Sequence, residues 1–491
     1  MSTSTKKTKN ENGVIAKIVA AVLAILVIAL CVFNLVNGKG ILLRSKTAAK
    51  SDNFKVSGTE MAYFAGNVYQ QFYSQYGEYL SAIGLDPNVS LKDQKCPSLE
   101  DGTWSDYFME QAETNVKQTM ALAEYAKANG IELGDEEKEA VENYVASMTE
   151  TAASYNRPLD NFLKAYFGNG INEKDLRNAL KLSFLADKAT SAFVEGVDVS
   201  KDAMEKYYAE NPDEFDGVDF YAYTLDISAA SEGADENAEE GEETVAVTSA
   251  AALNFIAGMA DVTDLNGFKT IVADYETTLN PEADAEAIVD GTLREHVLKS
   301  GVTDEELSAW LFDEAKVGDV KTVVDSENGL YSIFVLDKAA YRDDTMNRDV
   351  RHILIAADEE NPDDDSAAQA VLDELKAADF SEEKWNEFAA EKSIDTGSKD
   401  NGGLYEDFVH GQAYEEFDNW LFDADRKAGD SDVIKTDAGW HVIYYVGESD
   451  TAAWEPVAQS SITNTEYSAM VEEMGKSVEF IDSTLAKIEL N

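Results

Sequence analysis

The sequence contains little cysteine. Of its 491 residues only two are cysteines: Cys31 lies within an apolar run, and Cys96 stands alone after it. The part of the chain that follows the run therefore cannot close an internal disulfide. Two cysteines for a zinc site are not available there either.

Positive charge is also scarce. The chain has 40 Lys and Arg against 95 Asp and Glu, which gives a formal net charge of −55. A surface this acidic repels nucleic acid and anionic lipid, and it keeps a protein and its unfolded clients soluble. We therefore expect no DNA or RNA partner. The hydrophobic fraction of 44% is still enough for folded cores, and the length leaves room for about three domains.

The N-terminal region contains one long apolar run. Residues 1–13 are polar, and Ile18–Phe33 is then unbroken apolar and extends to 14–36 with its flanks, which is long enough to span a bilayer. A cleaved signal peptide is the alternative, but no small-x-small site follows the run, and Leu30 before Cys31 does not suit a lipoprotein site. We predict a cytoplasmic tail at 1–13 and a signal anchor at 14–36. Basic residues flank both sides of the run, so charge does not set its orientation.

A helical pattern extends from Thr59 to about Phe215, and we predict a helical domain over 37–217. Its first segment repeats aromatic residues at helical spacing from Tyr63 to Tyr79. These rings either form the core or line a groove for unfolded chain. The further helices predicted are Trp104–Asn129, Asp135–Tyr155, Leu159–Phe167, Glu173–Val194 and Lys201–Asn211.

The remainder of the chain contains an internal repeat. A Trp-Leu-Phe segment, a Gly-Asp turn and a final strand recur at a spacing of 110 residues, slipping by one at the turn. The repeat predicts two copies of one fold, 218–340 and 349–447. In this alignment Tyr331 replaces His441, and no histidine lies on the first strand near Tyr221–Tyr223. The matching segments are Glu306–Phe312 with Glu416–Phe422, Gly318-Asp319 with Gly429-Asp430, and Asn328–Ile333 with Ala438–Ile443.

The final segment, 448–491, predicts two amphipathic helices at about Ser461–Met474 and Val478–Ile488. We expect the last of them to pack back on the N-terminal helices.

The second copy resembles the parvulin family of peptidyl-prolyl isomerases. The resemblance rests on several short motifs taken together, since any one alone is weak. They are Arg351–Ile355, the helix Ala367–Ala378 with Phe380, Asn401-Gly402-Gly403, Phe408, Gly411-Gln412, Phe417, Phe422, Gly429 and Gly439–Ile443.

The whole arrangement resembles the secretion foldases of the PrsA and SurA type. This resemblance implies an α+β protein: an N-terminal transmembrane helix, an all-α chaperone domain, two parvulin-like α+β domains of which the first is degenerate, and C-terminal helices. It also implies an extracytoplasmic position of the large domain at the membrane of a Gram-positive bacterium, unfolded or newly secreted polypeptides with X-Pro bonds as partners, and no cofactor. The sequence sets no oligomeric state.

The resemblance also implies the site residues. In parvulins two imidazoles hydrogen-bond to each other beneath the active site, and a cysteine or aspartate faces the substrate carbonyl. Here His352 and His441 would be the pair and Asp395 the acidic residue, with Thr396 as the alternative because the register of that loop is open by one residue. The expected substrate-binding residues are Tyr405, Phe408, Gln412, Ala413, Phe417 and Phe422.

Several positions depart from the parvulin pattern. Where parvulins usually have Gly-Gly-Asp-Leu-Gly-Trp-Phe, residues 402–408 of this chain are Gly-Gly-Leu-Tyr-Glu-Asp-Phe. Ala413 stands where the family has a methionine in the pocket, and Ala438 stands where it often has a serine. Phosphate-directed parvulins need a basic cluster after the first strand because anions need paired cations. The loop here, 358–365, is acidic, so we expect unmodified or basic X-Pro substrates.

Other interpretations of the same residues stay open. The two histidines could be hydrogen-bonded core residues of an inactive copy, which would leave a peptide-binding chaperone or a surface scaffold without client binding. A metal site at His352, His441 and Asp395 has no support in the local spacing, and the acidic loops lack the calcium-loop order. We expect His296 and His410 to be surface residues.

Overall fold

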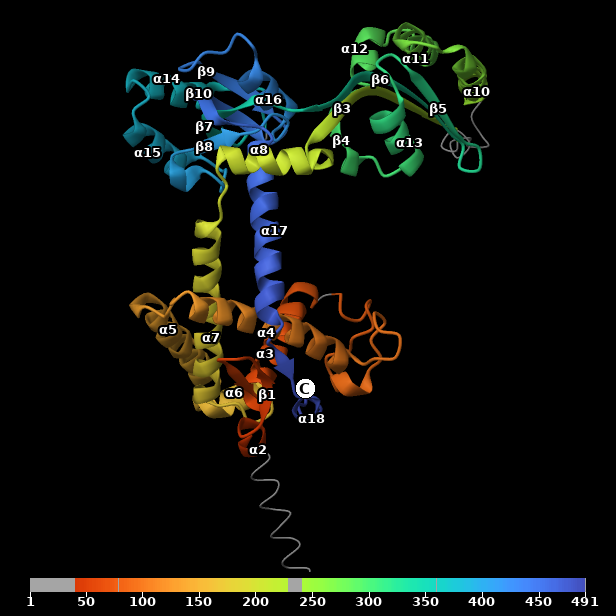
Figure 1. Cartoon of the computed structure of the whole chain (residues 1–491). Helices are drawn as coiled ribbons and strands as arrows, with labels where there is room; N and C mark the ends of the chain where they lie inside the picture. Colours follow the sequence, from red (N-terminus) through yellow and green to blue (C-terminus); the bar gives the residue numbers. More distant parts are fainter. Residues whose placement is uncertain (1–39, 78, 228–240, 359, 491) are drawn as a thin grey trace, which may run out of the picture. The chain divides into compact units, whose positions relative to one another are not determined.

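The computed structural model describes residues 40–77, 79–227, 241–358 and 360–490 (Figure 1). The chain divides into two compact units, Met1–Asp198 with Thr463–Asn491, and Val199–Ile462. The predicted tail at 1–13 and the predicted span at 14–36 lie outside the described residues. Within the described ranges, none of the helices has the length and apolar character needed to cross a bilayer.

The first unit is built mainly from helices, and polar caps fix where they begin. Ser57, Thr103 and Asn172 each accept a hydrogen bond from the backbone N–H three residues on, and an acidic side chain at that residue bonds back to the cap. Four of the predicted helices are present to within two residues at each end: α4 (Trp104–Ala128), α5 (Asp135–Ser154), α6 (Leu159–Phe167) and α7 (Glu173–Gly196). The segment with the aromatic stripe forms α3 (Gly58–Tyr76), which ends three residues before Tyr79, and a short α2 (Ile41–Arg44) precedes it.

The aromatic stripe of α3 belongs mostly to the core. Tyr63 and Phe64 are buried, and Tyr69 and Phe72 pack against the same cluster. Phe72 alone contacts four other rings, including those of Trp104 and Phe108 of α4. Only the C-terminal end of the stripe and the turn after it are exposed, at Tyr73, Tyr76 and Tyr79. The core interpretation therefore accounts for the buried part of the stripe.

The first unit is not all-α, and this corrects the sequence prediction. Its strands β1 (Thr47–Lys50), β2 (Lys55–Ser57) and β11 (Glu479–Phe480) form an antiparallel sheet of order β11-β1-β2. The C-terminal segment supplies β11 where a second helix was expected. The strand forms because the chain end returns to a free edge of the β1–β2 hairpin, a long-range pairing that local periodicity does not show.

The C-terminal segment otherwise follows the prediction in part. One helix, α17 (Glu455–Gly475), replaces the first of the two expected, and only a single turn, α18 (Asp482–Leu485), remains of the second. Leu485, Ile488 and Leu490 are nevertheless buried in the same cluster as the N-terminal helices. The expectation that the chain end packs back on those helices is confirmed.

The second unit contains two four-stranded antiparallel sheets with the same strand topology. In order along the chain, each sheet places its strands as second, first, fourth and third: β4-β3-β6-β5 and β8-β7-β10-β9. The first consists of β3 (Asp216–Asp226), β4 (Leu293–Leu298), β5 (Val320–Asp325) and β6 (Leu330–Arg342). The second consists of β7 (Met346–Ile355), β8 (Leu404–Phe408), β9 (Ser431–Thr436) and β10 (Gly439–Ala452).

Helices cover both faces of each sheet (Figure 1). On the second sheet, α14 (Ser366–Ala377) and α15 (Glu382–Lys392) pack on one face and α16 (Glu415–Phe422) packs on the other. On the first sheet, α10 (Gly241–Gly258), α11 (Leu265–Leu279) and α12 (Ala285–Asp290) pack on one face, and α13 (Glu305–Ala309) with the turn Trp310–Glu314 packs on the other. The unit begins with α8 (Lys201–Glu210).

The faces of the strands correct the repeat alignment. Ile333 of β6 faces α10 and α11, whereas Ile443, its counterpart at a spacing of 110, faces α16. Val442 faces the helix pair α14 and α15, so it is the true counterpart of Ile333. The last strand is therefore offset by 109 residues (442 − 333), because in a strand a slip of one residue exchanges the two faces.

Candidate functional site

Two neighbouring strands place the histidines on one face of the second sheet. In the pairing of β7 with β10, His352 lies opposite Ile443 and His441 lies opposite Leu354. The two imidazoles are thus diagonal neighbours on the face that α16 covers. Their rings are nearly parallel, with an interplanar angle of 15° and centroids 5.3 Å apart. Both are buried, at 6% and 4% exposure.

A continuous chain of hydrogen bonds runs through the pair. His352 Nδ1 lies 3.1 Å from His441 Nδ1, and His352 Nε2 lies 2.9 Å from Asp395 Oδ2. At the other end, His441 Nε2 lies 2.8 Å from Thr436 Oγ1. The Thr436 hydroxyl in turn accepts the backbone N–H of Ala438 at 3.2 Å. Every ring nitrogen of the pair therefore has a partner.

Asp395 fixes the protonation of this chain. Burial raises the pKa of Asp395, but hydrogen bonds from the Ser398 hydroxyl, the Gly397 N–H and His352 outweigh it and hold the pKa well below its usual range. The carboxylate is thus ionised and only accepts. His352 Nε2–H donates to it, His441 Nδ1–H donates to His352 Nδ1, and the Thr436 hydroxyl donates to His441 Nε2.

Both imidazoles are neutral in this arrangement. Burial lowers the pKa of His352, and the hydrogen bond to Asp395 only partly opposes it. Burial, together with repulsion from His352, lowers the pKa of His441 to about 4. The pair is therefore a rigid, uncharged floor with a fixed carboxylate at one end, and neither imidazole is poised to exchange a proton near neutral pH.

The loop after α15 supplies Asp395 and settles its register. The Ile394 N–H donates to Leu354 O of β7 at 2.9 Å, which fastens the loop to the strand next to His352. This leaves Thr396 exposed, so Asp395 is the residue that meets the histidine. The loop returns at Gly403, whose φ of +72° brings its Cα against the His352 carbonyl.

The expected substrate-binding residues come together with one exception. Five of them pack in or against one cluster beside the histidines, and Gln412 is exposed and lies outside that cluster. The Phe417 ring makes edge contacts with both imidazoles at centroid distances of 5.5 and 5.3 Å. The five are Tyr405, Phe408, Ala413, Phe417 and Phe422.

Tyr405 has a second contact that the sequence does not reveal. Its hydroxyl donates to Asp395 Oδ2 at 3.1 Å, the oxygen that also accepts from His352 and Ser398. Burial and this bond raise the pKa of Tyr405. Because Val350 of β7 pairs with Tyr405 of β8, the register of the sheet sets the position of the ring.

Sequence reasoning missed Ser398 and Thr436. Both are buried, and each bonds to one end of the chain formed by Asp395, His352 and His441. A buried hydroxyl has no periodic signature. The signal available for Thr436 was its place just before the turn that leads into the strand of His441, where Ala438 contributes only its backbone.

The remaining histidines differ from each other. His410 is exposed, as expected, and lies 3.2 Å from Asp418. His296 is half-buried, which corrects the surface prediction: it lies on β4, a strand that the sequence analysis missed, and its Nε2 lies 3.2 Å from the Tyr341 carbonyl oxygen. In the described ranges, no cluster of three or more His, Cys, Asp or Glu side chains could hold a metal ion.

The first sheet lacks the histidine pair. With the last strand offset by 109, Ser332 takes the place of His441 and its partner Thr224 takes the place of Leu354. Ala222, opposite Phe334, takes the place of His352. The pairing replaces the earlier match of Tyr331 with His441, since Tyr331 faces α10 and α11. The fold thus forms without the two imidazoles.

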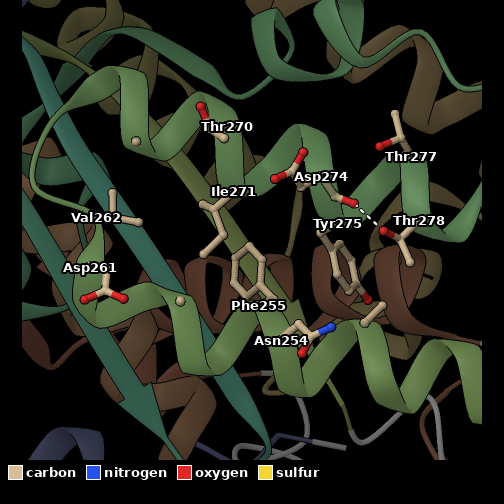
Figure 2. A pocket seen from close by; sticks show the side chains of 13 residues that line it. Asn254, Phe255, Asp261, Val262, Thr270, Ile271, Asp274, Tyr275, Thr277 and Thr278 are labelled. Carbon is tan, nitrogen blue, oxygen red and sulfur yellow. Dashed lines mark hydrogen bonds between the residues drawn. The ribbon is translucent and has the colours of Figure 1, made fainter.

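A cavity of about 630 Å³ lies between α10 and α11 of the first sheet. Figure 2 shows the rings of Phe255 and Tyr275 between the two helices, with centroids 5.4 Å apart. These helices cover the face of the first sheet that corresponds to the α14 and α15 side of the second. The cavity is therefore not the counterpart of the histidine site.

The second sheet and the helices that cover it form a parvulin-type prolyl isomerase domain. Residues 352–447 match the family described as "Rotamase: PPIC-type PPIASE domain". The resemblance to parvulins is thereby confirmed, and the chain carries a domain of this class.

Curated relatives point to one kind of protein that carries such a domain. The chain is 30% identical over 117 residues to "Foldase protein PrsA 1" of Listeria monocytogenes, covering 24% of this chain and 36% of that protein. It is 32% identical over 158 residues to "Foldase protein PrsA" of Caldanaerobacter subterraneus subsp. tengcongensis, covering 32% and 38%. The chain thus matches little more than a third of the length of these relatives.

Solved structures of similar proteins include parvulin and PrsA chains. One is "NmPin, the parvuline of Nitrosopumilus maritimus", at 28% identity over 21% of this chain and 98% of that chain, with a TM-score of 0.17. Another is PrsA from Bacillus subtilis, at 12% identity over 77% and 88%, with a TM-score of 0.27.

Proposed function

We propose that the chain is a membrane-anchored foldase that catalyses cis/trans isomerisation of X-Pro bonds in exported proteins and also binds unfolded chain. The observation that carries this is the neutral, hydrogen-bonded pair His352 and His441, closed at one end by the ionised Asp395 and flanked by an aromatic cluster. The match of residues 352–447 to the rotamase family supports the same reaction.

The reaction requires no nucleophile. Rotation of a prolyl amide meets a barrier of roughly 18–20 kcal/mol because amide resonance must be broken. Resonance places negative charge on the carbonyl oxygen, so a fixed carboxylate facing that oxygen disfavours the planar form and favours the twisted one. Asp395 is the group that would do this, because it stays ionised at neutral pH.

The roles of the other residues follow from their positions. His352 and His441 hold Asp395 and form a floor that stays uncharged near neutral pH and is held in place by a hydrogen bond at every ring nitrogen. Phe417, Phe408 and Phe422 would hold the proline ring in an apolar pocket from which water is excluded. Gln412, which is exposed, would contact the chain outside that pocket.

The proposed organisation places the membrane span at 14–36 and the large domain on the extracytoplasmic side of a Gram-positive cell membrane. The helical domain (37–217) would bind unfolded client, and the catalytic domain would be 349–447. The degenerate domain (218–340) and the C-terminal segment (448–491) complete the chain. Newly secreted polypeptides would be the partners, and nucleic acid would not.

A chaperone without isomerase activity is the second candidate, and one observation favours it. Asp395 Oδ2 already accepts hydrogen bonds from His352, Ser398 and Tyr405. A carboxylate oxygen so fully bonded carries less free charge toward a substrate carbonyl. In this case both parvulin-like domains would be peptide-binding platforms.

The two candidates are separated by measuring isomerisation and aggregation on the same preparations. With the full chain, we expect proline peptides to exchange faster with wild type than with Asp395→Ala, by about tenfold or more, which corresponds to about 1.4 kcal/mol of barrier. Suppression of client aggregation should persist in that variant. Equal exchange rates, with aggregation still suppressed, would favour the chaperone alone.

A further inference from the structure

The first unit contains a cleft lined largely by aromatic rings. It lies between α5 and α6, with one residue of α3 at its edge, and has a volume of about 590 Å³. Five of the ten residues that line it are aromatic: Tyr144, Tyr155, Phe162, Tyr166 and Phe167. None of these rings belongs to the aromatic stripe of α3. The cleft borders the core, because Phe167 packs against Tyr63 of the stripe with centroids 5.0 Å apart, and it shares no lining residue with the histidine site.

The sequence explains why the rings face one space. On α5, the lining residues follow one another at spacings of four, three and four from Tyr144 to its C-cap residue Tyr155, which is one face of a helix. After the turn at Asn156, with φ +53°, α6 runs back and presents Phe162 and Tyr166, four residues apart. Two aromatic helix faces therefore meet across the cleft.

The rings are ordered, and three of them reach solvent. Phe162 is buried, and it stacks on Tyr155 with centroids 5.8 Å apart and on Tyr166 with centroids 5.6 Å apart. Tyr155 is 66% exposed, Tyr166 45% and Tyr144 37%. Exposed tyrosines that stack on a buried phenylalanine form a prepared surface, because their conformational entropy is already reduced before anything binds.

The polar groups of the cleft include one side chain that only donates hydrogen bonds and no carboxylate that only accepts them. Although the chain has 95 acidic residues, no Asp or Glu lines the cleft. Its one charged lining residue is Arg157, a donor without acceptor capacity, whereas the tyrosine and Thr151 hydroxyls and the Asn67 amide can both donate and accept. A ligand for this surface should therefore offer acceptors together with apolar rings.

We propose that this cleft is a docking site for proline-rich, extended segments of unfolded polypeptide. A polyproline II segment has no internal hydrogen bonds, and its prolines lack N–H groups, so it offers carbonyl acceptors almost alone. Its pyrrolidine rings pack into aromatic-lined grooves. The donors Arg157 and Tyr155, beside a ladder of stacked rings, complement both features.

The proposal rests on the proposed function and extends it by naming a second, non-catalytic site for proline-containing clients. Binding at the cleft would hold a client on the same chain as the isomerase domain and so raise the local concentration of its X-Pro bonds. Long clients should gain from this, whereas a peptide too short to occupy both sites should not.

The test measures binding of a fluorescein-labelled peptide of repeated Ala-Pro-Pro units to the full chain by fluorescence anisotropy. The variant is Tyr155→Ala with Tyr166→Ala, both exposed. The matched control is Tyr79→Ala, a tyrosine of the same unit that is 65% exposed and lies outside the cleft. We expect the double variant to weaken binding by roughly tenfold or more, which is typical of losing aromatic anchors, and the control to bind as wild type does.

Three results would overturn the proposal. They are unchanged affinity in the double variant, equal loss in Tyr79→Ala, and equal affinity for a peptide of repeated Ala-Leu-Ser units, which would make the cleft a general apolar site. If the double variant loses helical circular dichroism, binding is measured instead with Arg157→Gln, which removes the exposed cation and leaves every ring in place. Unchanged affinity in Arg157→Gln would then overturn the proposal.

The proposal and the isomerase proposal fail in different ways. Binding to the cleft is measured without turnover and should be the same in Asp395→Ala. Isomerisation of a short proline peptide should be unchanged in the cleft variant. If Asp395→Ala retains full isomerase activity while the cleft variant loses binding, the isomerase assignment fails and the docking site stands. If Asp395→Ala loses isomerase activity while the cleft variant keeps its binding, only the docking-site proposal fails.

Discussion

The Nδ1 atoms of His352 and His441 lie 3.1 Å apart, on adjacent antiparallel strands. Only one proton can lie between them. The ionised Asp395 accepts a hydrogen bond from His352 Nε2–H, so the neutral His352 carries no proton on Nδ1. The proton between the two Nδ1 atoms therefore belongs to His441, and the Thr436 hydroxyl donates to His441 Nε2 at the other end. The pair is therefore defined by its hydrogen bonds to its neighbours, and disturbing either end should change both imidazoles.

We expect the stability of the second unit to fall between pH 6.5 and about 4. The pKa of His441 drops from its ordinary 6.5 to about 4 in the folded chain. As the pH falls, the unfolded state takes up the proton first, so the free energy of unfolding decreases through this window and is constant above it. The loss for His441 is at most about 3.4 kcal/mol.

Urea unfolding at neutral pH and near pH 4.5 measures this loss. His441→Phe, which keeps a ring but does not titrate, should show a smaller difference between the two pH values than wild type. Equal pH dependence in wild type and His441→Phe would contradict the neutral, buried state of the pair.

Tyr405→Phe should affect Asp395 without emptying the proline pocket. The substitution keeps the ring and removes the hydroxyl that donates to Asp395 Oδ2. One such bond contributes about 1 kcal/mol, so we expect the pKa of Asp395 to rise and kcat to change by about fivefold, with KM nearly constant. If the Tyr405 hydrogen bond restrains the Asp395 carboxylate, its loss raises kcat. If the bond positions the carboxylate for the reaction, its loss lowers kcat. An unchanged pH profile and unchanged kcat would show that the hydroxyl does neither.

Gly403→Ala should destabilise the site far more than Gly411→Ala. Both glycines have positive φ, +72° and +83°. A Cβ on Gly403 would lie 2.1 Å from the His352 carbonyl oxygen, whereas one on Gly411 would meet nothing within 4 Å. The Gly411 variant should lose about 1–2 kcal/mol for its backbone conformation, and the Gly403 variant should lose more because β8 must also move from β7. Equal losses of stability in the two variants, measured by thermal unfolding, would show that the chain accommodates a Cβ at Gly403 next to the His352 carbonyl without further cost.

The loop after β7 predicts discrimination against phosphorylated substrates. It carries Asp358 and Asp363, and Lys435, a cation that contacts it, is paired with Asp363. A phosphoserine-proline peptide should therefore be isomerised about tenfold more slowly than an alanine-proline peptide at low salt. The difference should shrink in about 1 M salt, where the Debye length is about 3 Å. Faster turnover of the phosphopeptide would contradict this role of the loop.

The sequence predicted the elements with strong local signals. The helices α4 to α7 appear at the expected ranges, and two of them, α4 and α7, begin at side-chain caps, Thr103 and Asn172, with an acidic residue three positions on. His352 and His441, on the adjacent strands β7 and β10, and Asp395, in the loop after α15, lie together as the resemblance implied.

What the sequence could not show depends on long-range pairing. β11 forms only because residues 479–480 return to β1, more than four hundred positions away in the chain. The 110-residue spacing hid a slip of one in the last strand of the repeat, which only the two faces of the sheet reveal. The hydroxyls of Thr436 and Ser398 have no periodic signature, because their role depends on the groups that they contact in the folded chain.

The most direct test of the account is the rate of cis/trans exchange in an unphosphorylated X-Pro peptide, measured by exchange NMR with the full chain. Wild type should accelerate exchange, His352→Ala should lose that acceleration by about tenfold or more, and Tyr79→Ala, an exposed change in the other unit, should match wild type. An unaltered spectrum of the remaining amides in His352→Ala would show that the fold persists. If His352→Ala exchanges the peptide as fast as wild type, the histidine pair is not the catalytic centre.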